Sequence, residues 1–200
     1  AVAREVLPKQ LNVDAKDLVV VSIMPCTAKK YEAQLPKFAN DGRPDVDYVL
    51  TTQEVGRMIN CMGIKFDELD AEAYDMPMGF ATGAGVIFGA TGGVMEAALR
   101  YAAEKVEGKK LKNIEFKSVR GLKKLKDAEV ELGGNKLKIA VVHGLASAKA
   151  LVEKILAGEV SYDFVEVMAC PGGCVAGGGQ PIQHDAKLRE RRAWGLYQAD

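Results

Sequence analysis

The sequence carries four cysteines, and the spacing of two of them suits a metal centre. Cys170 and Cys174 flank Pro-Gly-Gly, and the segment continues into Val-Ala-Gly-Gly-Gly-Gln-Pro. Two thiolates on either side of a glycine turn can converge on one soft metal centre, because the backbone is free to fold around it. The same spacing is compatible with a buried or disulfide-bonded pair. Four cysteines in 200 residues are too few for a disulfide-framed scaffold, so metal binding, catalysis and burial are the uses to compare.

The other two cysteines lie far from this pair in the sequence. Cys26 belongs to Met-Pro-Cys-Thr-Ala-Lys-Lys, directly after a short apolar run, and Cys61 belongs to Ile-Asn-Cys-Met-Gly. The apolar run is typical of a buried strand, so we expect Cys26 near the carboxyl end of a strand. Cys61 falls on a predicted helix, where we expect it to be a core residue.

Several common metal and cofactor sites are excluded by spacing. The two Cys-x-x-Cys pairs of a zinc ribbon are absent, and His143 and His184 have no regular spacing to the cysteines, so both are expected to be structural or surface residues. The glycines of 83–89 miss the dinucleotide fingerprint by one residue, and the chain has no Gly-Lys-Ser/Thr phosphate loop. However, eleven of the 21 glycines cluster at 79–93 and 172–179. This clustering favours backbone wrapped around a bound group, with flexible loops as the alternative.

Length, composition and charge exclude other classes of protein. The 200 residues are 48% hydrophobic and 27% charged, so the chain can bury a core and is not disordered. Its 27 basic and 27 acidic side chains give a formal charge of zero, which argues against a nucleic-acid partner. The apolar runs are far shorter than the roughly 20 residues of a membrane-spanning helix, and the amino-terminal segment lacks signal-peptide features. We expect a cytoplasmic protein, with the periplasm as the alternative, and a start at Ala1 rather than Met indicates a piece of a longer chain.

Hydrophobic periodicity predicts strands and helices in alternation. Strands are expected at 18–23, 48–52, 114–119, 136–143 and 164–168, and a glycine turn at 133–135 is expected to join 128–132 to 136–143 as a hairpin. Helices are expected at 53–62, with Thr52 as N-cap, and at 92–107, 147–157 and 185–197. The order strand, helix, strand favours a right-handed crossover between parallel strands. The predicted fold is α/β, with a twisted, partly parallel four-stranded sheet flanked by helices.

Two long segments of the chain resemble signatures of a known enzyme family. They are Met24-Pro25-Cys26-Thr-Ala-Lys29-Lys-Tyr-Glu32 and Glu166-Val-Met168-Ala-Cys170-Pro-Gly-Gly-Cys174-Val-Ala-Gly-Gly-Gly-Gln180-Pro181. Both are similar to cysteine signatures of the catalytic (H-cluster) domain of [FeFe]-hydrogenases, the iron-only hydrogenases, and 85–100 resembles that family too. The resemblance covers essentially the whole chain. It implies that residues 1–200 are a partial H-cluster domain, truncated at both ends, with one lobe of the two-lobed iron-only hydrogenase fold.

The resemblance implies an H-cluster, which is a [4Fe-4S] cluster joined through one cysteine sulfur to a two-iron subcluster. Carried over by position, Cys26 and Cys170 bind the [4Fe-4S] cubane, and Cys174 provides the bridging sulfur. Lys29 is expected to donate a hydrogen bond to a cyanide of the two-iron subcluster; outside this family it would be a solvated surface lysine. The other residues expected to lie at the cofactor are Met24, Pro25, Phe88, Gly89, Met168, Gly172 and Gly173, although core packing explains the apolar ones equally well.

The implied reaction is the reversible reduction of protons to H2 by a ferredoxin- or NAD(P)-linked oxidoreductase. The metal centre must supply this chemistry, while the polypeptide supplies ligands, hydrogen-bond donors and a dry pocket. The implied partners are H2 and protons, ferredoxin or an accessory iron–sulfur domain, and the missing amino-terminal part of the catalytic domain. Glu32 and Glu166 lie beside the signatures and could move protons, but we expect surface or structural roles for both.

The chain departs from the family at one signature. The family's upstream Thr-Ser-Cys-Cys-Pro segment, which provides the remaining cubane ligand and a proton-relay cysteine, is absent. An alternative function is therefore a hydrogenase-like iron–sulfur carrier or regulatory protein without hydrogen turnover. The retained Met24, Lys29 and Met168 weigh against that alternative, and the two long signatures weigh against a purely structural subunit.

Overall fold

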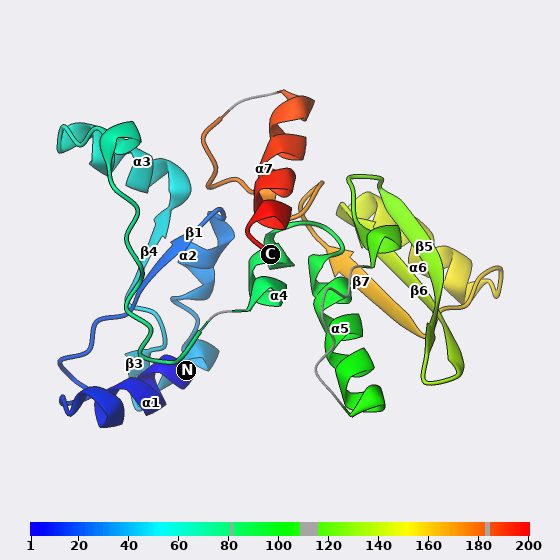
Figure 1. Cartoon of the computed structure of the whole chain (residues 1–200), viewed down its shortest axis with the longest axis horizontal. Helices are drawn as coiled ribbons and strands as arrows, with labels where there is room; N and C mark the ends of the chain where they lie inside the picture. The colour runs from blue at the N-terminus through cyan, green and yellow to red at the C-terminus, as the bar shows by residue number, and fades with distance from the viewer. Residues whose placement is uncertain (81, 109–115, 183–184) are drawn as a thin grey trace. The chain divides into compact units, whose positions relative to one another are not determined.

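The computed structural model describes residues 1–80, 82–108, 116–182 and 185–200, and these form two compact units (Figure 1). Unit 1 consists of Ala1–Phe80 and Gly177–Ile182, and unit 2 consists of Ala81–Ala176 and Gln183–Asp200. The chain therefore returns to unit 1 for six residues, Gly177–Ile182, which begin three residues after Cys174 in the second cysteine signature.

Unit 1 is built on two parallel strands. Strand β1 (Val21–Met24) pairs with β4 (Tyr48–Thr51), so that the carboxyl ends of both strands, Met24 and Thr51, lie side by side. A second, antiparallel pair is formed by β2 (Ala39–Asn40) and β3 (Arg43–Pro44). The helices of this unit are α1 (Val2–Leu11), α2 (Ala28–Glu32) and α3 (Thr52–Cys61), with 3-10 helices at Pro36–Phe38 and Phe66–Glu68.

Helix α3 corrects two sequence predictions. Its N-cap is Thr51 rather than Thr52, because the Thr51 hydroxyl accepts the Glu54 N–H at 3.2 Å while the Glu54 carboxylate accepts the Thr51 N–H at 2.8 Å. This reciprocal pair requires a spacing of three residues, which Thr51 and Glu54 have. Cys61, the last residue of α3, is exposed, so the prediction that it belongs to the core is wrong. The helix has no buried residue at all.

Unit 2 contains a three-stranded mixed sheet in the order β5-β6-β7. Strands β5 (Leu125–Leu132) and β6 (Asn135–His143) form the predicted hairpin; Gly133 and Gly134 have φ of 56° and 80°, as the twist of a two-residue turn requires. Helix α6 (Leu145–Leu156) leads from β6 to the parallel strand β7 (Phe164–Met168). The remaining helices are α4 (Gly83–Val86), α5 (Gly93–Glu107) and α7 (Ala186–Gln198), with 3-10 helices at Ile87–Gly89, Lys117–Val119 and Cys174–Ala176.

Alternate residues of β6 face two different helices. Ile139 and Val141 pack in one cluster with Met95 and Leu99 of α5. The alternate residues Ala140 and Val142 pack in another cluster with Ala148 and Leu151 of α6. Because successive side chains of a strand point to opposite faces, α5 and α6 cover opposite faces of this sheet. The nearly continuous apolar run of β6 follows from this two-sided burial.

The α/β class and the partly parallel sheet with flanking helices are confirmed, but the described strands divide among sheets of two, two and three strands rather than one of four. The strand expected at 114–119 is absent in its described part, where Lys117–Val119 is a 3-10 helix, and 114–115 lie outside the described residues. The Phe116 N–H donates to the Glu96 carboxylate at 3.4 Å and Val119 is buried against α5, so this segment needs no neighbouring strand. In the described part of the chain, no helix is long and apolar enough to cross a membrane.

Candidate metal centre

Cys26 lies in the turn that follows a strand, as predicted. Strand β1 ends at Met24, and α2 begins at Ala28, so Pro25, Cys26 and Thr27 form a short connection, which we call the Cys26 loop. Cys26 is partly buried. The carboxyl ends of parallel strands are common positions for binding loops, because the connections from neighbouring strands meet at the same edge.

The end of the second cysteine signature packs directly on the Cys26 loop within unit 1. The Gly179 N–H donates to the Pro25 carbonyl at 3.1 Å, and the Gly179 carbonyl accepts the Gln53 N–H at 3.0 Å. A Cβ atom at position 179 would lie 2.6 Å from the Cys26 nitrogen and 2.8 Å from the Pro25 carbonyl carbon. Only glycine therefore fits at this position without moving the loop that carries Cys26.

Lys29 and Met24 line one cavity in unit 1. The Lys29 ammonium donates to both carboxylate oxygens of Glu32, at 2.7 and 2.9 Å, and the two side chains are each 42% exposed. The cavity has a volume of about 170 Å³ and is lined by Ser22, Met24, Lys29, Glu32, Ala33, Phe38, Asp45, Val46 and Val49. Lys29 is thus a half-exposed, ion-paired lysine among the residues that line this cavity.

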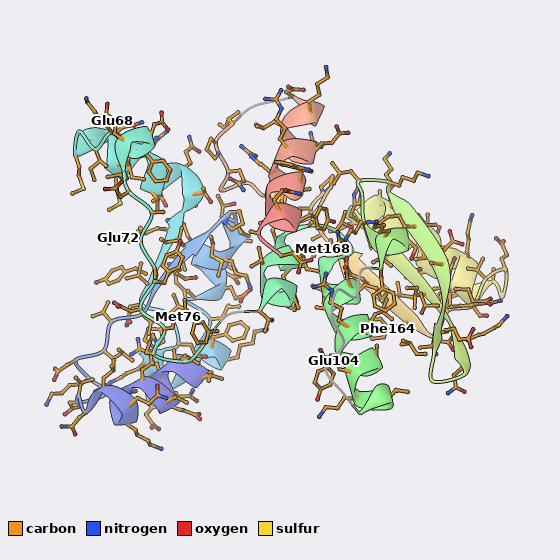
Figure 2. The ribbon with its side chains drawn as sticks, in the orientation of Figure 1. Glu68, Glu72, Met76, Glu104, Phe164 and Met168 are labelled. Atoms are coloured by element: carbon orange, nitrogen blue, oxygen red, sulfur yellow. The ribbon has the colours of Figure 1, made fainter. Side chains whose placement is uncertain are left out.

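The Cys170–Cys174 segment, which we call the Cys170 loop, begins two residues after β7 in unit 2. Met168 is the last residue of that strand, at the opposite end from Phe164 (Figure 2). Gly172 and Gly173 have φ of 94° and 89°, and the Gly173 N–H donates to the Cys170 carbonyl at 3.0 Å, which closes a tight turn. These φ values favour glycine strongly. Cys170 is partly buried and Cys174 is exposed.

His143 is hydrogen-bonded to the backbone of the Cys170 loop. It is 5% exposed, and its Nδ1 accepts the Gly172 N–H at 3.0 Å. Because Nδ1 accepts, the ring proton resides on Nε2, which donates to the Leu122 carbonyl at 3.1 Å. The structural role expected for His143 is confirmed. His184 lies outside the described residues.

The glycine-rich segment around Gly89 packs against the same loop. The Thr91 N–H donates to the Gly172 carbonyl at 3.3 Å. A Cβ atom on Gly173 would lie 2.7 Å from the Thr91 nitrogen and 3.1 Å from the Gly89 carbonyl oxygen. Three predicted lining residues, Gly89, Gly172 and Gly173, are therefore brought together within unit 2. Their neighbour Phe88 is 47% exposed.

Two buried charged groups hold this arrangement together. The Glu166 carboxylate accepts the N–H groups of Gly92 and Met95, at 2.6 and 2.7 Å, and so satisfies the amino terminus of α5. Glu166 is 7% exposed, in agreement with the structural role expected for it. Lys126 of β5 donates to the carbonyls of Thr91 at 3.0 Å and Gly121 at 2.7 Å. Burial lowers the pKa of Lys126 to about 8, and the charge of Glu166 opposes that shift.

Sequence reasoning missed Lys126 and Thr91, although one signal for Lys126 was present. Strand β5 alternates, and Lys126 shares its inward face with Val130. A lysine at an inward position of an amphipathic strand predicts a buried, hydrogen-bonded ammonium. Thr91 had no such signal, since its burial depends on contacts with segments distant in sequence.

The predicted ligands are divided between the two units. Cys26 belongs to unit 1, whereas Cys170 and Cys174 belong to unit 2. Within the described residues (1–80, 82–108, 116–182 and 185–200), no three His, Cys, Asp or Glu side chains lie close enough together to hold a metal ion. The convergence of the three sulfurs therefore stays a prediction.

The donor atoms nevertheless fit an iron–sulfur centre. No two cysteines are joined by a disulfide within the described residues, so their sulfur atoms are not excluded as cluster ligands. Cys26, Cys170 and Cys174 lie in loops whose close backbone packing requires glycine, at Gly179 beside Cys26 and at Gly173 between the other two cysteines. Soft thiolate donors select iron–sulfur clusters over hard cations. The Thr91 hydroxyl, beside the Cys170 loop, is buried and has no hydrogen-bond partner among the described residues.

Comparison with known proteins gives hydrogenase subunits and an iron–sulfur assembly factor as relatives of the chain. The chain is 48% identical over 201 residues to the NADP-reducing hydrogenase subunit HndD of Solidesulfovibrio fructosivorans, covering 100% of this chain and 34% of that protein. It is 49% identical over 182 residues to the periplasmic [Fe] hydrogenase large subunit of Nitratidesulfovibrio vulgaris, covering 91% of this chain and 43% of that protein. The cytosolic Fe-S cluster assembly factor narfl of Xenopus tropicalis is 35% identical, covering 86% of this chain and 37% of that protein. The chain thus spans less than half the length of each of these relatives.

A solved structure has the same fold. The apo [FeFe]-hydrogenase HydA1 of Chlamydomonas reinhardtii, variant C377H, superimposes with a TM-score of 0.78 at 38% identity, covering 98% of this chain and 56% of that one. The family model described as the iron only hydrogenase large subunit, C-terminal domain, matches residues 1–178. The resemblance seen in the two cysteine signatures is confirmed: the chain belongs to the iron-only hydrogenase large-subunit family, in its C-terminal domain.

Proposed function

We propose that this chain is part of the catalytic domain of an [FeFe]-hydrogenase, which reversibly reduces protons to H2 at an H-cluster. The observation that carries the proposal is the contact of Gly179 with the Cys26 loop. Two cysteine signatures that lie at opposite ends of the sequence meet there, backbone to backbone. A glycine at 179 allows that approach, and a larger residue would block it.

Cys26 and Cys170 are the proposed ligands of the [4Fe-4S] cubane, and Cys174 is the proposed bridging ligand. Gly179, which packs on the Cys26 loop within unit 1, follows Cys174 by five residues in the sequence. When bound, the H-cluster supplies the redox chemistry of the proton/H2 couple. The fourth cubane ligand is proposed to come from outside these 200 residues, since Cys61 lies at the exposed end of α3.

The surrounding residues have proposed roles in binding and shielding the two-iron subcluster. The Lys29 ammonium is held by Glu32 at the cavity that Met24 also lines, and from there it can donate to an anionic ligand. The remaining proposed contacts exclude water or allow close approach of the backbone; they are Pro25, Phe88, Gly89, Met168, Gly172 and Gly173.

The proposed partners follow from this function. H2 and protons are the reactants, and ferredoxin or an accessory iron–sulfur domain carries the electrons. The amino-terminal part of the catalytic domain completes the ligand set. We propose the cytoplasm as the compartment, although the relatives include a periplasmic hydrogenase subunit.

The test is hydrogen uptake with a dye acceptor, measured on the protein in the form that its gene encodes, after anaerobic cluster maturation. Cys174→Ala should abolish uptake, because the two-iron subcluster loses its link to the cubane. Cys61→Ala is the matched control and should retain uptake, since Cys61 is exposed and outside the signatures. Unchanged uptake in Cys174→Ala would rule out the bridging role.

A second candidate function is iron–sulfur cluster transfer or assembly, which the narfl relative favours. The 48–49% identity to hydrogenase subunits against 35% to narfl ranks hydrogen turnover first. Infrared spectroscopy distinguishes the two functions. A hydrogenase shows CO and cyanide stretching bands after maturation, whereas a cluster carrier shows the cubane absorbance alone.

A further inference from the structure

Helix α7 packs, within unit 2, against the turn that contains Cys174. Ala193 of α7 is buried in one hydrophobic cluster with Ala90 and Val175, and Leu196 packs against the same cluster. Val175 is the middle residue of the 3-10 helix Cys174–Ala176. The helix therefore covers the backbone that directly follows the proposed bridging ligand.

Arg192 of α7 is hydrogen-bonded to the backbone of this turn. Its Nη1 donates to the Val175 carbonyl at 3.2 Å, and Val175 is only 4% exposed. The N–H of the same peptide unit, which belongs to Ala176, donates to the Gly173 carbonyl at 3.1 Å. The peptide unit between Val175 and Ala176 is thus held through its carbonyl by α7 and through its N–H by the start of the turn.

These two hydrogen bonds fix the backbone on either side of Cys174. The bond between Gly173 and Ala176 closes one 3-10 turn, and the last carbonyls of such a turn have no partner within it. Arg192 supplies a partner from a charged donor, which makes a stronger hydrogen bond than a neutral one. Cys174 itself is exposed, so it is the backbone of this turn that limits where its sulfur atom can lie.

The other end of α7 is held independently of Arg192. Asp200, two residues after the helix, accepts from Arg100 at 2.6 Å and from Arg120 at 3.1 Å. The fully buried Glu96 carboxylate accepts from the same two arginines, at 2.8 Å each. Because these ion pairs and the Ala193 cluster remain when Arg192 is replaced, we expect α7 to stay in place in an Arg192 variant.

We propose that Arg192 is a positioning residue for Cys174, which holds the turn in the place from which the Cys174 sulfur bridges the two parts of the H-cluster. This inference rests on the proposed function. The cubane has other proposed thiolate ligands, whereas the two-iron subcluster is joined to it through Cys174. Loss of the Arg192 hydrogen bond therefore loosens the turn in the cluster-free protein, and it weakens retention of the two-iron subcluster more than retention of the cubane.

The first measurement is amide hydrogen exchange of the cluster-free protein, in the form that its gene encodes, followed by mass spectrometry. Arg192→Met should speed exchange in peptides that span 172–178 about tenfold, as expected for the loss of one hydrogen bond to a charged group. Peptides of α7 should change much less. Arg192→Lys should recover part of the protection, since an ammonium can also donate to a carbonyl. Arg191→Met is the matched control, because Arg191 is the exposed neighbour on the same helix.

The second measurement follows anaerobic maturation. Cubane content is measured by electron paramagnetic resonance of the reduced cluster, and two-iron content by the infrared bands of CO and cyanide. Arg192→Met should lower the two-iron content per cubane about tenfold, which is the lower end of the effect of residues that orient metal ligands. Arg192→Lys should recover part of this loss, and Arg191→Met should match the wild type.

Four results would overturn the inference, and they separate it from the proposed function. Equal exchange at 172–178 in Arg192→Met and Arg191→Met refutes the hold on the turn. Faster exchange throughout α7, with equal losses of cubane and two-iron subcluster, shows that Arg192 only docks the helix. An Arg192→Lys variant no better than Arg192→Met refutes the hydrogen bond to Val175 as the cause. A matured wild-type protein without CO and cyanide bands refutes the proposed function, and this inference with it, whatever the exchange data show.

Discussion

Two adjacent glycines of the Cys170 loop allow a sharp test of how tightly this loop is packed. Gly172 and Gly173 have φ of 94° and 89°, so alanine at either position carries similar backbone strain, about 1–2 kcal/mol. Their surroundings differ. A Cβ on Gly172 would meet only Ala176 and Leu122 side-chain atoms at 3.7 Å, whereas a Cβ on Gly173 would lie 2.7 Å from the Thr91 nitrogen.

The steric difference can be expressed as a difference in stability. Forcing a methyl group into packed backbone costs about 1–3 kcal/mol beyond the shared strain. For a protein of this size each kcal/mol corresponds to about 2–4 °C in Tm. Gly173→Ala should therefore unfold about 2–12 °C below Gly172→Ala, with both variants below the wild type.

The assay is thermal unfolding of the cluster-free protein, followed by circular dichroism. Gly172→Ala is the matched control, since it differs by one position and carries the same strain. Equal melting temperatures for the two variants would refute the close packing of Gly173 on the 89–91 segment. A Gly172→Ala variant that melts below Gly173→Ala would refute it more strongly.

Three further predictions concern the supports of the two cysteine loops. Gly179→Ala should lower the unfolding free energy by about 1–3 kcal/mol in urea titrations, because its Cβ collides with the Cys26 loop. Gly178→Ala is the control and should cost much less, since its Cβ meets only the Thr27 side chain, from 3.2 Å. Equal losses in the two variants would contradict the close packing of Gly179 on the Cys26 loop. His143→Phe should cost about 1–3 kcal/mol by leaving the Gly172 N–H buried and unpaired. His143→Asn, whose side-chain oxygen can accept that N–H, should recover part of the loss, and equal losses in the two variants would refute the hydrogen bond. Because burial lowers the pKa of Lys126 from 10.5 to about 8, the folded protein binds fewer protons than the unfolded chain between these values. The unfolding free energy should therefore rise with pH from 8 to 10, by at most about 1.4 kcal/mol per pH unit, and an unchanged slope in Lys126→Met would refute the assignment.

The local pattern of the sequence was sufficient for most elements. Helix α5 ends at Glu107 with Gly108 as its C-cap in the left-handed conformation, and β7 spans Phe164–Met168, both as the sequence pattern predicts. The glycine turn between β5 and β6 was also predictable, because a two-residue hairpin turn requires residues that tolerate positive φ. These features depend on neighbours within a few residues, which the sequence displays directly.

The sequence by itself determined the family of the chain, because two long segments resemble its cysteine signatures, and the iron–sulfur class of the candidate site is what that resemblance predicts. The tertiary structure decided what supports the site. Burial of Thr91, the pairing of His143 with Gly172 and the exposure of Cys61 all depend on segments that are distant in the chain. A hydrogen bond or a close backbone contact has a range of a few ångströms, so only the folded arrangement brings such partners together.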